Sequence, residues 1–88
     1  MPASVDVLTL FHNERGLVSP YFESLAAISI SFSLYLLDNG SRDGTPDRIT
    51  AEVKKLFVPS HFYRSLRNNG FARGMNLLAG QSDADYLF

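Results

Sequence analysis

The sequence predicts an α/β domain with a parallel sheet and helices on both of its faces. Three observations predict this fold: short apolar runs typical of strands, segments with helical spacing of apolar residues between them, and polar turn clusters where the runs end. Strands that alternate with helices form βαβ units, in which the strands are parallel and the crossovers right-handed. The 88 residues suffice for one small domain, and they show no internal repeat or linker.

The first half of the chain predicts two strands and one helix. Residues 5–11 (VDVLTLF) form a β-branched and aromatic run with a single charge, which is typical of a strand buried on both faces. Ser19 followed by Pro20 pairs a capping hydroxyl with a first-turn proline and predicts a helix that continues to about Ile28. Residues 31–37 (SFSLYLL) predict the second strand, which ends at a DNGS turn cluster.

The second half repeats this alternation. Thr45 followed by Pro46 again pairs a cap with a proline, and the apolar residues after it have helical spacing. Residues 61–66 (HFYRSL) predict a third strand, residues 71–79 a short helix and residues 86–88 the start of a fourth strand. Because this last strand begins where the sequence stops, we expect the chain to be truncated.

Composition excludes several classes of protein. A formal net charge of −1 offers no general basic field, so we expect no nucleic-acid partner. The absence of cysteine excludes disulfides and thiolate metal sites and fits a cytoplasmic, reducing compartment. No basic segment followed by a long apolar run begins the chain, and the longest apolar stretch, residues 25–37, is too short to cross a bilayer. We therefore expect neither a signal peptide nor membrane insertion.

Polar residues gather where the predicted strands end. His12 and Asn13 follow the first strand, Asp38 and Asn39 follow the second, and the loop 68–73 follows the third. Because the strands are parallel, all of these ends lie on one edge of the sheet, where open α/β sheets bind ligands. The sequence therefore predicts a ligand site at this edge.

The NGSRDG segment at residues 39–44 has two glycines ahead of a predicted helix, as anion-binding loops do. Its spacing matches neither G-x-x-x-x-G-K-[ST] nor G-x-G-x-x-G. We therefore predict a turn, in which Asp43 and Thr45 have structural roles.

Four stretches in order, VDVLTLFHNE, LYLLDNGSRDGT, RNNGFARGMN and SDADYLF, resemble the opening of family-2 glycosyltransferases, in particular rhamnosyltransferase-like members. The resemblance covers nearly the whole chain. It implies a Rossmann-like, nucleotide-binding sheet that forms the N-terminal half of a GT-A-type fold. It also implies a nucleotide-sugar donor and inversion at the anomeric carbon.

The resemblance assigns roles to individual residues. Asp38 matches the position whose carboxylate accepts the imide N–H of the donor base; it can also cap its own turn, and the two roles can coexist. His12 falls where the family often has an aromatic residue against the base, although a solvated histidine without a role is the alternative. Arg73 is the nearest cation for the diphosphate, or one of several surface arginines. The predicted nucleotide-binding residues are His12, Asn13, Asp38, Asn39, Asn69, Gly70 and Arg73.

The tripeptide Asp83-Ala84-Asp85 spells the D-x-D pattern with which glycosyltransferases bind a divalent cation. We do not assign it that role, because it precedes the fourth strand and so lies at the amino end of the sheet. In the family, the metal-binding carboxylates follow this strand. We therefore expect residues 1–88 to form a partial domain that ends before the D-x-D motif, with no catalytic residue, and with Mg²⁺ or Mn²⁺ bound only in the complete form.

The leading hypothesis is a donor-binding fragment whose complete form transfers a hexosyl group from a uridine or thymidine diphosphate sugar to a glycan. An alternative is a stand-alone module that binds nucleotide without turnover or associates with itself, because a small core and an open sheet edge favour association. We accordingly expect either a homo-oligomer or a missing C-terminal part. A signalling receiver ranks last, because His12-Asn13-Glu14 supplies only one carboxylate for the acidic pocket such a domain needs.

Overall fold

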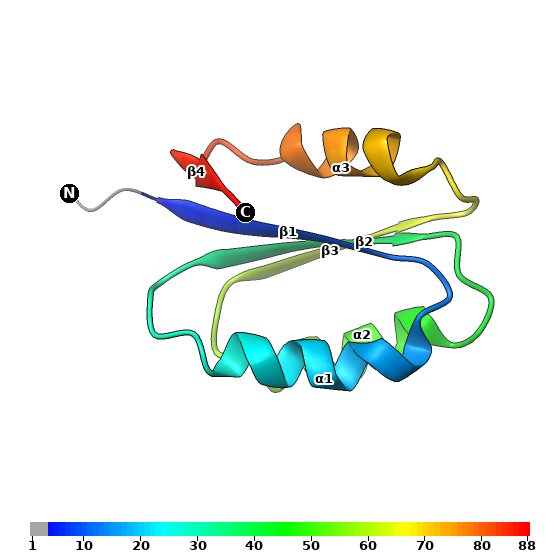
Figure 1. The fold of residues 1–88 in the computed structure, drawn as a ribbon, viewed down its shortest axis with the longest axis horizontal. Coiled ribbons are helices and arrows are strands. Elements are labelled where there is room, and N and C mark those ends of the chain that lie inside the picture. The colour runs from blue at the N-terminus through cyan, green and yellow to red at the C-terminus, as the bar shows by residue number, and fades with distance from the viewer. Residues whose placement is uncertain (1–3) are drawn as a thin grey trace.

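The computed structural model describes residues 4–88 and confirms the α/β fold with a parallel sheet (Figure 1). The sheet has four strands in the order β3-β2-β1-β4, and each neighbouring pair is parallel. Figure 1 shows α1 and α2 covering one face of the sheet and α3 covering the other. In chain order the elements are β1 Val5–Phe11, α1 Arg15–Ala26, β2 Ser33–Asn39, α2 Thr45–Val53, β3 Ser60–Ser65, α3 Phe71–Ala79 and β4 Tyr86–Leu87.

The main core lies between the sheet and the layer formed by α1 and α2. Alternate residues of β2, Leu34 and Leu36, are fully buried there. Val18 and Phe22 of α1 and Ile49 of α2 pack in the same cluster. Each of these side chains removes apolar surface from water, and full burial of such a side chain contributes about 1.5–3 kcal/mol.

Helix α1 begins at Arg15, four residues before the predicted start at Ser19, and ends at Ala26 instead of Ile28. Pro20 therefore lies inside the helix and not in its first turn. The start is set from outside: the backbone N–H of Glu14 donates to the Thr45 hydroxyl, and that of Arg15 to the Asp43 carboxylate. These partners are distant in the sequence, so the local cap-and-proline pattern misplaced the start.

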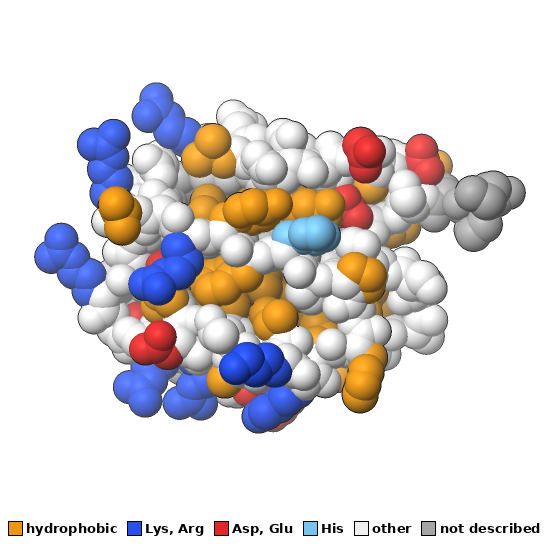
Figure 2. All heavy atoms as spheres, turned by 180° about the vertical axis from the view of Figure 1, so that it is seen from behind, with side chains coloured by type: hydrophobic (Ala, Val, Ile, Leu, Met, Phe, Trp, Pro, Cys, Tyr) orange, Lys and Arg blue, Asp and Glu red, His pale blue; other side chains and the backbone are white. Residues whose placement is uncertain are grey.

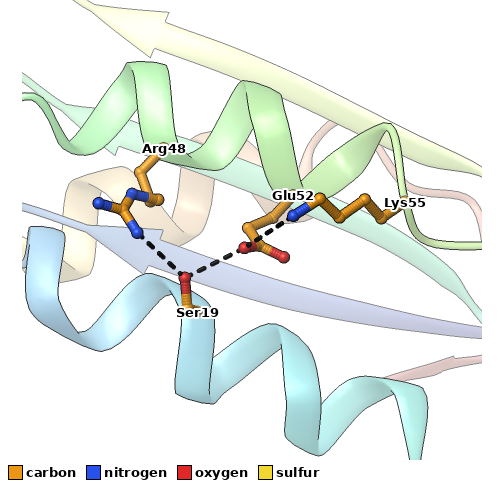
Figure 3. A network of polar contacts seen from close by, with 4 residues as sticks. All are labelled: Ser19, Arg48, Glu52 and Lys55. Carbon is orange, nitrogen blue, oxygen red and sulfur yellow. Dashed lines mark hydrogen bonds and ion pairs between the residues drawn. The ribbon is translucent and has the colours of Figure 1, made fainter.

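The misassigned cap Ser19 instead faces α2 (Figure 3). Its hydroxyl donates to Oε1 of Glu52 at 3.0 Å and accepts from a guanidinium nitrogen of Arg48 at 3.4 Å. Lys55 approaches the same Glu52 carboxylate at 3.9 Å. Such partly exposed pairs each contribute at most about 1 kcal/mol, so this network orients the two helices and adds little to the apolar core.

Strand β2 is displaced toward the chain end relative to the prediction. It begins at Ser33, two residues later than expected, and it includes Asp38 and Asn39. These two residues pair with Arg64 and Ser65 of β3, so they are the last residues of a strand and not the first of a turn. Strand β3 begins one residue earlier than predicted, whereas β1 and α3 have the predicted bounds.

Helix α3 approaches the other face of the sheet through a glycine. An ideal Cβ on Gly74 would lie 2.3 Å from Cδ1 of Leu10 and 3.3 Å from Cδ2 of Leu37. No larger residue fits at this distance unless the helix or Leu10 moves. Within residues 4–88, no helix has both the length and the apolar character needed to cross a membrane.

Candidate functional site

Three loops meet at the carboxyl edge of the sheet: residues 12–14 after β1, residues 40–44 after β2 and residues 66–70 after β3. Asn13 joins the first two loops, because its N–H donates to the Ser41 hydroxyl at 2.8 Å and its Oδ1 accepts the N–H of Arg42 at 2.8 Å. Asn13 has a φ of 49°, a left-handed conformation that asparagine tolerates better than most residues. The first two loops therefore form one hydrogen-bonded surface.

Gly40 joins the second loop to the third by close backbone contact. It has a φ of 79°, and an ideal Cβ on it would lie 2.6 Å from the carbonyl carbon of Arg67 and 2.7 Å from the nitrogen of Asn68. Backbone atoms cannot rotate away as the end of a side chain can. Only glycine therefore allows both the positive φ and the close approach of the Arg67 and Asn68 backbone at this position.

His12 is half-buried between β1 and β2. Its Nδ1 lies 2.8 Å from the backbone oxygen of Asn39, and because a carbonyl can only accept, Nδ1 carries the proton. The neutral ring then has an acceptor at Nε2, which lies 3.2 Å from the side-chain nitrogen of Asn13. Because Nε2 has a single lone pair, its capacity to accept a hydrogen bond is used within the first loop by Asn13.

Asp38 is only 1% exposed and makes the turn contacts predicted as its alternative role. Its Oδ2 accepts the N–H of Ser41 at 3.0 Å, and its Oδ1 accepts the Ser41 hydroxyl at 2.5 Å. Each carboxylate oxygen keeps a second lone pair. The turn-capping role of Asp38 is therefore present in the structure. A hydrogen bond from the donor base to its carboxylate stays a prediction.

Asp43 connects the amino ends of α1 and α2. Its Oδ2 accepts the N–H of Arg15 at 3.2 Å, and its Oδ1 accepts the N–H of Thr45 at 3.0 Å together with the Thr45 hydroxyl. The Thr45 hydroxyl, aided by these backbone N–H groups, holds the pKa of Asp43 below its usual range. The structural roles predicted for Asp43 and Thr45 are confirmed.

Asn39 and Asn69 hold the third loop against β2. The side-chain oxygen of Asn39 accepts the N–H of Asn69 at 3.0 Å, and its side-chain nitrogen donates to the backbone oxygen of Gly70 at 3.2 Å. The structure thus brings together six of the seven predicted site residues. Arg73, the seventh, is an exposed residue of α3, and within residues 4–88 no hydrogen bond ties it to the loops.

Charge is distributed unevenly between the two ends of the sheet. Exposed arginines surround the carboxyl edge, at positions 15, 42, 67 and 73. Exposed Asp83 and Asp85 lie at the opposite end, beside the start of β4. Figure 2 shows Lys and Arg side chains at the left and along the bottom of the molecule, and acidic side chains at the upper right and at the lower left. The carboxyl edge thus offers arginines to an anionic ligand, and Glu14, Asp38 and Asp43 lie at the same edge.

The D-x-D tripeptide lies at the amino end of β4, as predicted, and has structural partners. Oδ2 of Asp85 accepts the N–H of Ser4 at 2.9 Å, which fastens the start of β4 beside β1. Among residues 4–88, no group of three or more His, Asp or Glu side chains could hold a metal ion.

Sequence reasoning missed the partners that build this surface, namely Ser41 under Asp38 and the loop 68–70 around Asn39. The DNGS turn cluster signals Ser41, because serine is common in such turns. No local signal marks the Asn39 contacts, which join residues 29 to 31 positions apart.

Comparison with known proteins agrees with this architecture. The family described as "Glycosyl transferase family 2" matches residues 6–88. The solved structure of a mannosyltransferase, PcManGT from Pyrobaculum calidifontis in complex with GDP-Man and Mn²⁺, superposes with a TM-score of 0.91 at 15% sequence identity. The match covers 99% of this chain but 26% of that one, so this chain spans about a quarter of its length. None of the curated proteins matches the sequence. The family match over nearly the whole chain, together with the GT-A fold, shows that the chain belongs to glycosyl transferase family 2.

Proposed function

We propose that this chain is the donor-recognition part of a glycosyltransferase and binds the nucleoside diphosphate of a sugar donor at the carboxyl edge of the sheet. The observation that carries this proposal is that hydrogen bonds join the three loops to one another and to the end of β2 at that edge. The exposed arginines around it favour the negative charge of a diphosphate.

We further propose a uridine or thymidine donor. Uracil and thymine carry an imide N–H, which an acceptor at the edge can bind, whereas cytosine lacks that proton. One acceptor group supports this choice: each oxygen of the Asp38 carboxylate keeps a lone pair beyond its hydrogen bond to Ser41. The solved mannosyltransferase holds GDP-Man, and guanine also has a ring N–H beside a carbonyl, so guanosine diphosphate belongs in the test.

In the complete form, we propose transfer of a hexosyl group to a glycan acceptor. Mg²⁺ or Mn²⁺ would supply charge neutralisation of the departing diphosphate, and a carboxylate would take the proton of the acceptor hydroxyl. The described residues offer no cluster for the metal, so this chain's own part is to bind and orient the nucleotide. A cytoplasmic location stays a prediction.

The test is titration of the ¹⁵N-labelled chain with uridine, thymidine, guanosine and cytidine diphosphates. We expect uridine diphosphate to shift the backbone amides of His12, Asn13, Asn69 and Gly70 more than cytidine diphosphate does. Because exposed arginines at positions 15, 42, 67 and 73 would attract the diphosphate, affinity should fall as salt is added. Shifts that spread over β4 instead, or that are equal for all four nucleotides, would contradict the proposed site.

Asp38→Asn separates the two roles of Asp38. If the carboxylate reads the base, the change of a charged to a neutral acceptor weakens uridine diphosphate binding by about 1–2 kcal/mol while the fold persists. If Asp38 only holds Ser41, the variant loses stability but keeps the preference for uridine over cytidine. A urea denaturation curve beside the titration distinguishes the two results.

A non-catalytic, self-associating module is the second candidate function. The observation in its favour is an apolar hollow of about 280 Å³ lined by Val5, Val7, Ile28, Ile30, Phe32 and Phe88. It lies at the opposite end of the sheet from the loops, so association there and nucleotide binding are compatible.

A further inference from the structure

Asn39 is the last residue of β2, and its side chain is 1% exposed. A side-chain amide offers two N–H donors and one oxygen with two lone pairs. Both donors are used, toward Oδ1 of Asn68 at 3.0 Å and the backbone oxygen of Gly70 at 3.2 Å. The oxygen accepts the backbone N–H of Asn69 at 3.0 Å and its side-chain nitrogen at 3.3 Å. All four positions are occupied, so the side chain has no hydrogen-bonding capacity left for a nucleotide.

This single side chain holds three successive residues of the third loop. Asn68 reinforces the arrangement by accepting the N–H of Gly70 at 2.7 Å. Gly70 in turn precedes α3, and its oxygen accepts the N–H of Gly74 in the first turn of that helix. The position of α3, and with it that of Arg73, therefore depends on the Asn39 amide.

The backbone of Asn39 acts on the other side of the edge. Its carbonyl oxygen accepts Nδ1–H of His12, which fixes both the ring orientation and the tautomer. This contact does not depend on the side chain at position 39. Asn39 thus fixes His12 of the first loop through its backbone carbonyl, and residues 68–70 of the third loop through its side chain.

We propose that Asn39 is a positioning residue of the nucleotide-binding edge and not a ligand of the nucleotide. Resting on the proposed function, this inference deepens it: Asn39 holds His12 and residues 68–70 in place before the nucleotide arrives, so binding costs less ordering. The position requires an amide, because an aspartate there would turn a carboxylate toward two acceptors, Oδ1 of Asn68 and the oxygen of Gly70.

The experiment compares Asn39→Asp and Asn39→Ala with the parent chain, all labelled with ¹⁵N. Gln81→Glu is the matched control, because it makes the same amide-to-carboxylate change at an exposed residue after α3. Without ligand, hydrogen exchange and ¹⁵N relaxation report the order of the amides of residues 69 and 70. The ¹⁵N shifts of the His12 ring report its tautomer. Uridine diphosphate titration then gives the affinity.

We expect both Asn39 variants to exchange the amides of residues 69 and 70 faster while the β1 and β2 amides and the His12 tautomer stay as in the parent. Affinity should fall about tenfold or more in both, because Asn39→Asp loses the two donated hydrogen bonds behind the site and Asn39→Ala loses all four. Gln81→Glu should change neither the exchange of the amides of residues 69 and 70 nor the affinity for uridine diphosphate.

Two results would overturn the inference. Parent-like order at residues 69 and 70 in a folded Asn39→Asp chain would show that the amide does not hold the loop. Parent-like affinity despite a loosened loop would show that its position is irrelevant to binding. If the parent itself binds no nucleoside diphosphate, the proposed function fails and the edge is not a nucleotide site, whereas the ligand-free arm still decides whether Asn39 orders the loop.

Discussion

Gly40 combines a left-handed backbone with backbone neighbours at 2.6–2.8 Å from an added Cβ. We predict that Gly40→Ala lowers the free energy of unfolding by about 2–4 kcal/mol, from strain in φ plus overpacking. Urea denaturation followed by circular dichroism measures it. Gly16→Ala is the control, since nothing lies within 4 Å of the added carbon and alanine favours a helix by up to about 1 kcal/mol. Equal effects in the two variants would contradict the contact between the second and third loops.

The hydrogen bonds of Asp43 predict that the stability of the fold depends on pH. The pKa of its carboxyl is lowered in the folded state, so its contribution to stability is present above about pH 4, the ordinary value for Asp, and is lost as pH falls through the folded pKa. Asp43→Asn should therefore be less stable than the parent at pH 7, with a difference that shrinks toward pH 2. Urea midpoints across this range measure it, and Glu23→Gln on the exposed side of α1 serves as the control. A difference that is independent of pH would refute the capping role.

At the scale of elements, the sequence predicted what depends on neighbours along the chain. The bounds of β1 and α3 follow from local apolar patterns and agree with the structure. The predicted start of α1 was wrong, because the N–H groups where the helix begins are capped by Asp43 and Thr45, about thirty residues away in the sequence. The partners of Asn39 escaped prediction for the same reason. Local pattern therefore located the edge, whereas the contacts that assemble it required the structure.

Gly74 tests how α3 is seated on the sheet. An alanine there would overlap Cδ1 of Leu10, at 2.3 Å from the added carbon, and crowd Cδ2 of Leu37, at 3.3 Å. Overpacking costs about 1–3 kcal/mol and exceeds the helix-propensity gain of about 1 kcal/mol, so Gly74→Ala should be destabilising. Gly80→Ala is the control, because its nearest neighbours are at 3.5 Å and its φ of −66° suits alanine. Denaturation midpoints in which both variants equal the parent would show that α3 shifts freely.

At the scale of the whole molecule, the two ends of the sheet differ in chemistry. The carboxyl edge carries exposed arginines and polar loops, whereas the amino end combines acidic residues with an apolar hollow beside β4. Phe88 is 72% exposed and Ile30 59% exposed at that hollow. Because the ends are spatially separate, a change at one should leave the other intact, and this separation makes association testable without affecting the proposed nucleotide site.

We predict that the 88-residue polypeptide associates with itself through the β4 end. The N–H of Tyr86 donates to the oxygen of Ser4, just before β1, and that of Phe88 to the oxygen of Asp6 in β1. The N–H of Leu87 between them therefore points away from β1, toward the open edge of the sheet, as alternation along a strand requires. An unpaired edge beside exposed apolar side chains favours strand pairing with a second copy. Association should appear at roughly 0.1 mM, the range of small contacts. Sedimentation velocity should show it weakened in Ile30→Ser and unchanged in Leu66→Ser, whose leucine is 102% exposed at the carboxyl edge. A parent that remains monomeric at several times this concentration, or equal weakening in both variants, would refute the β4 interface.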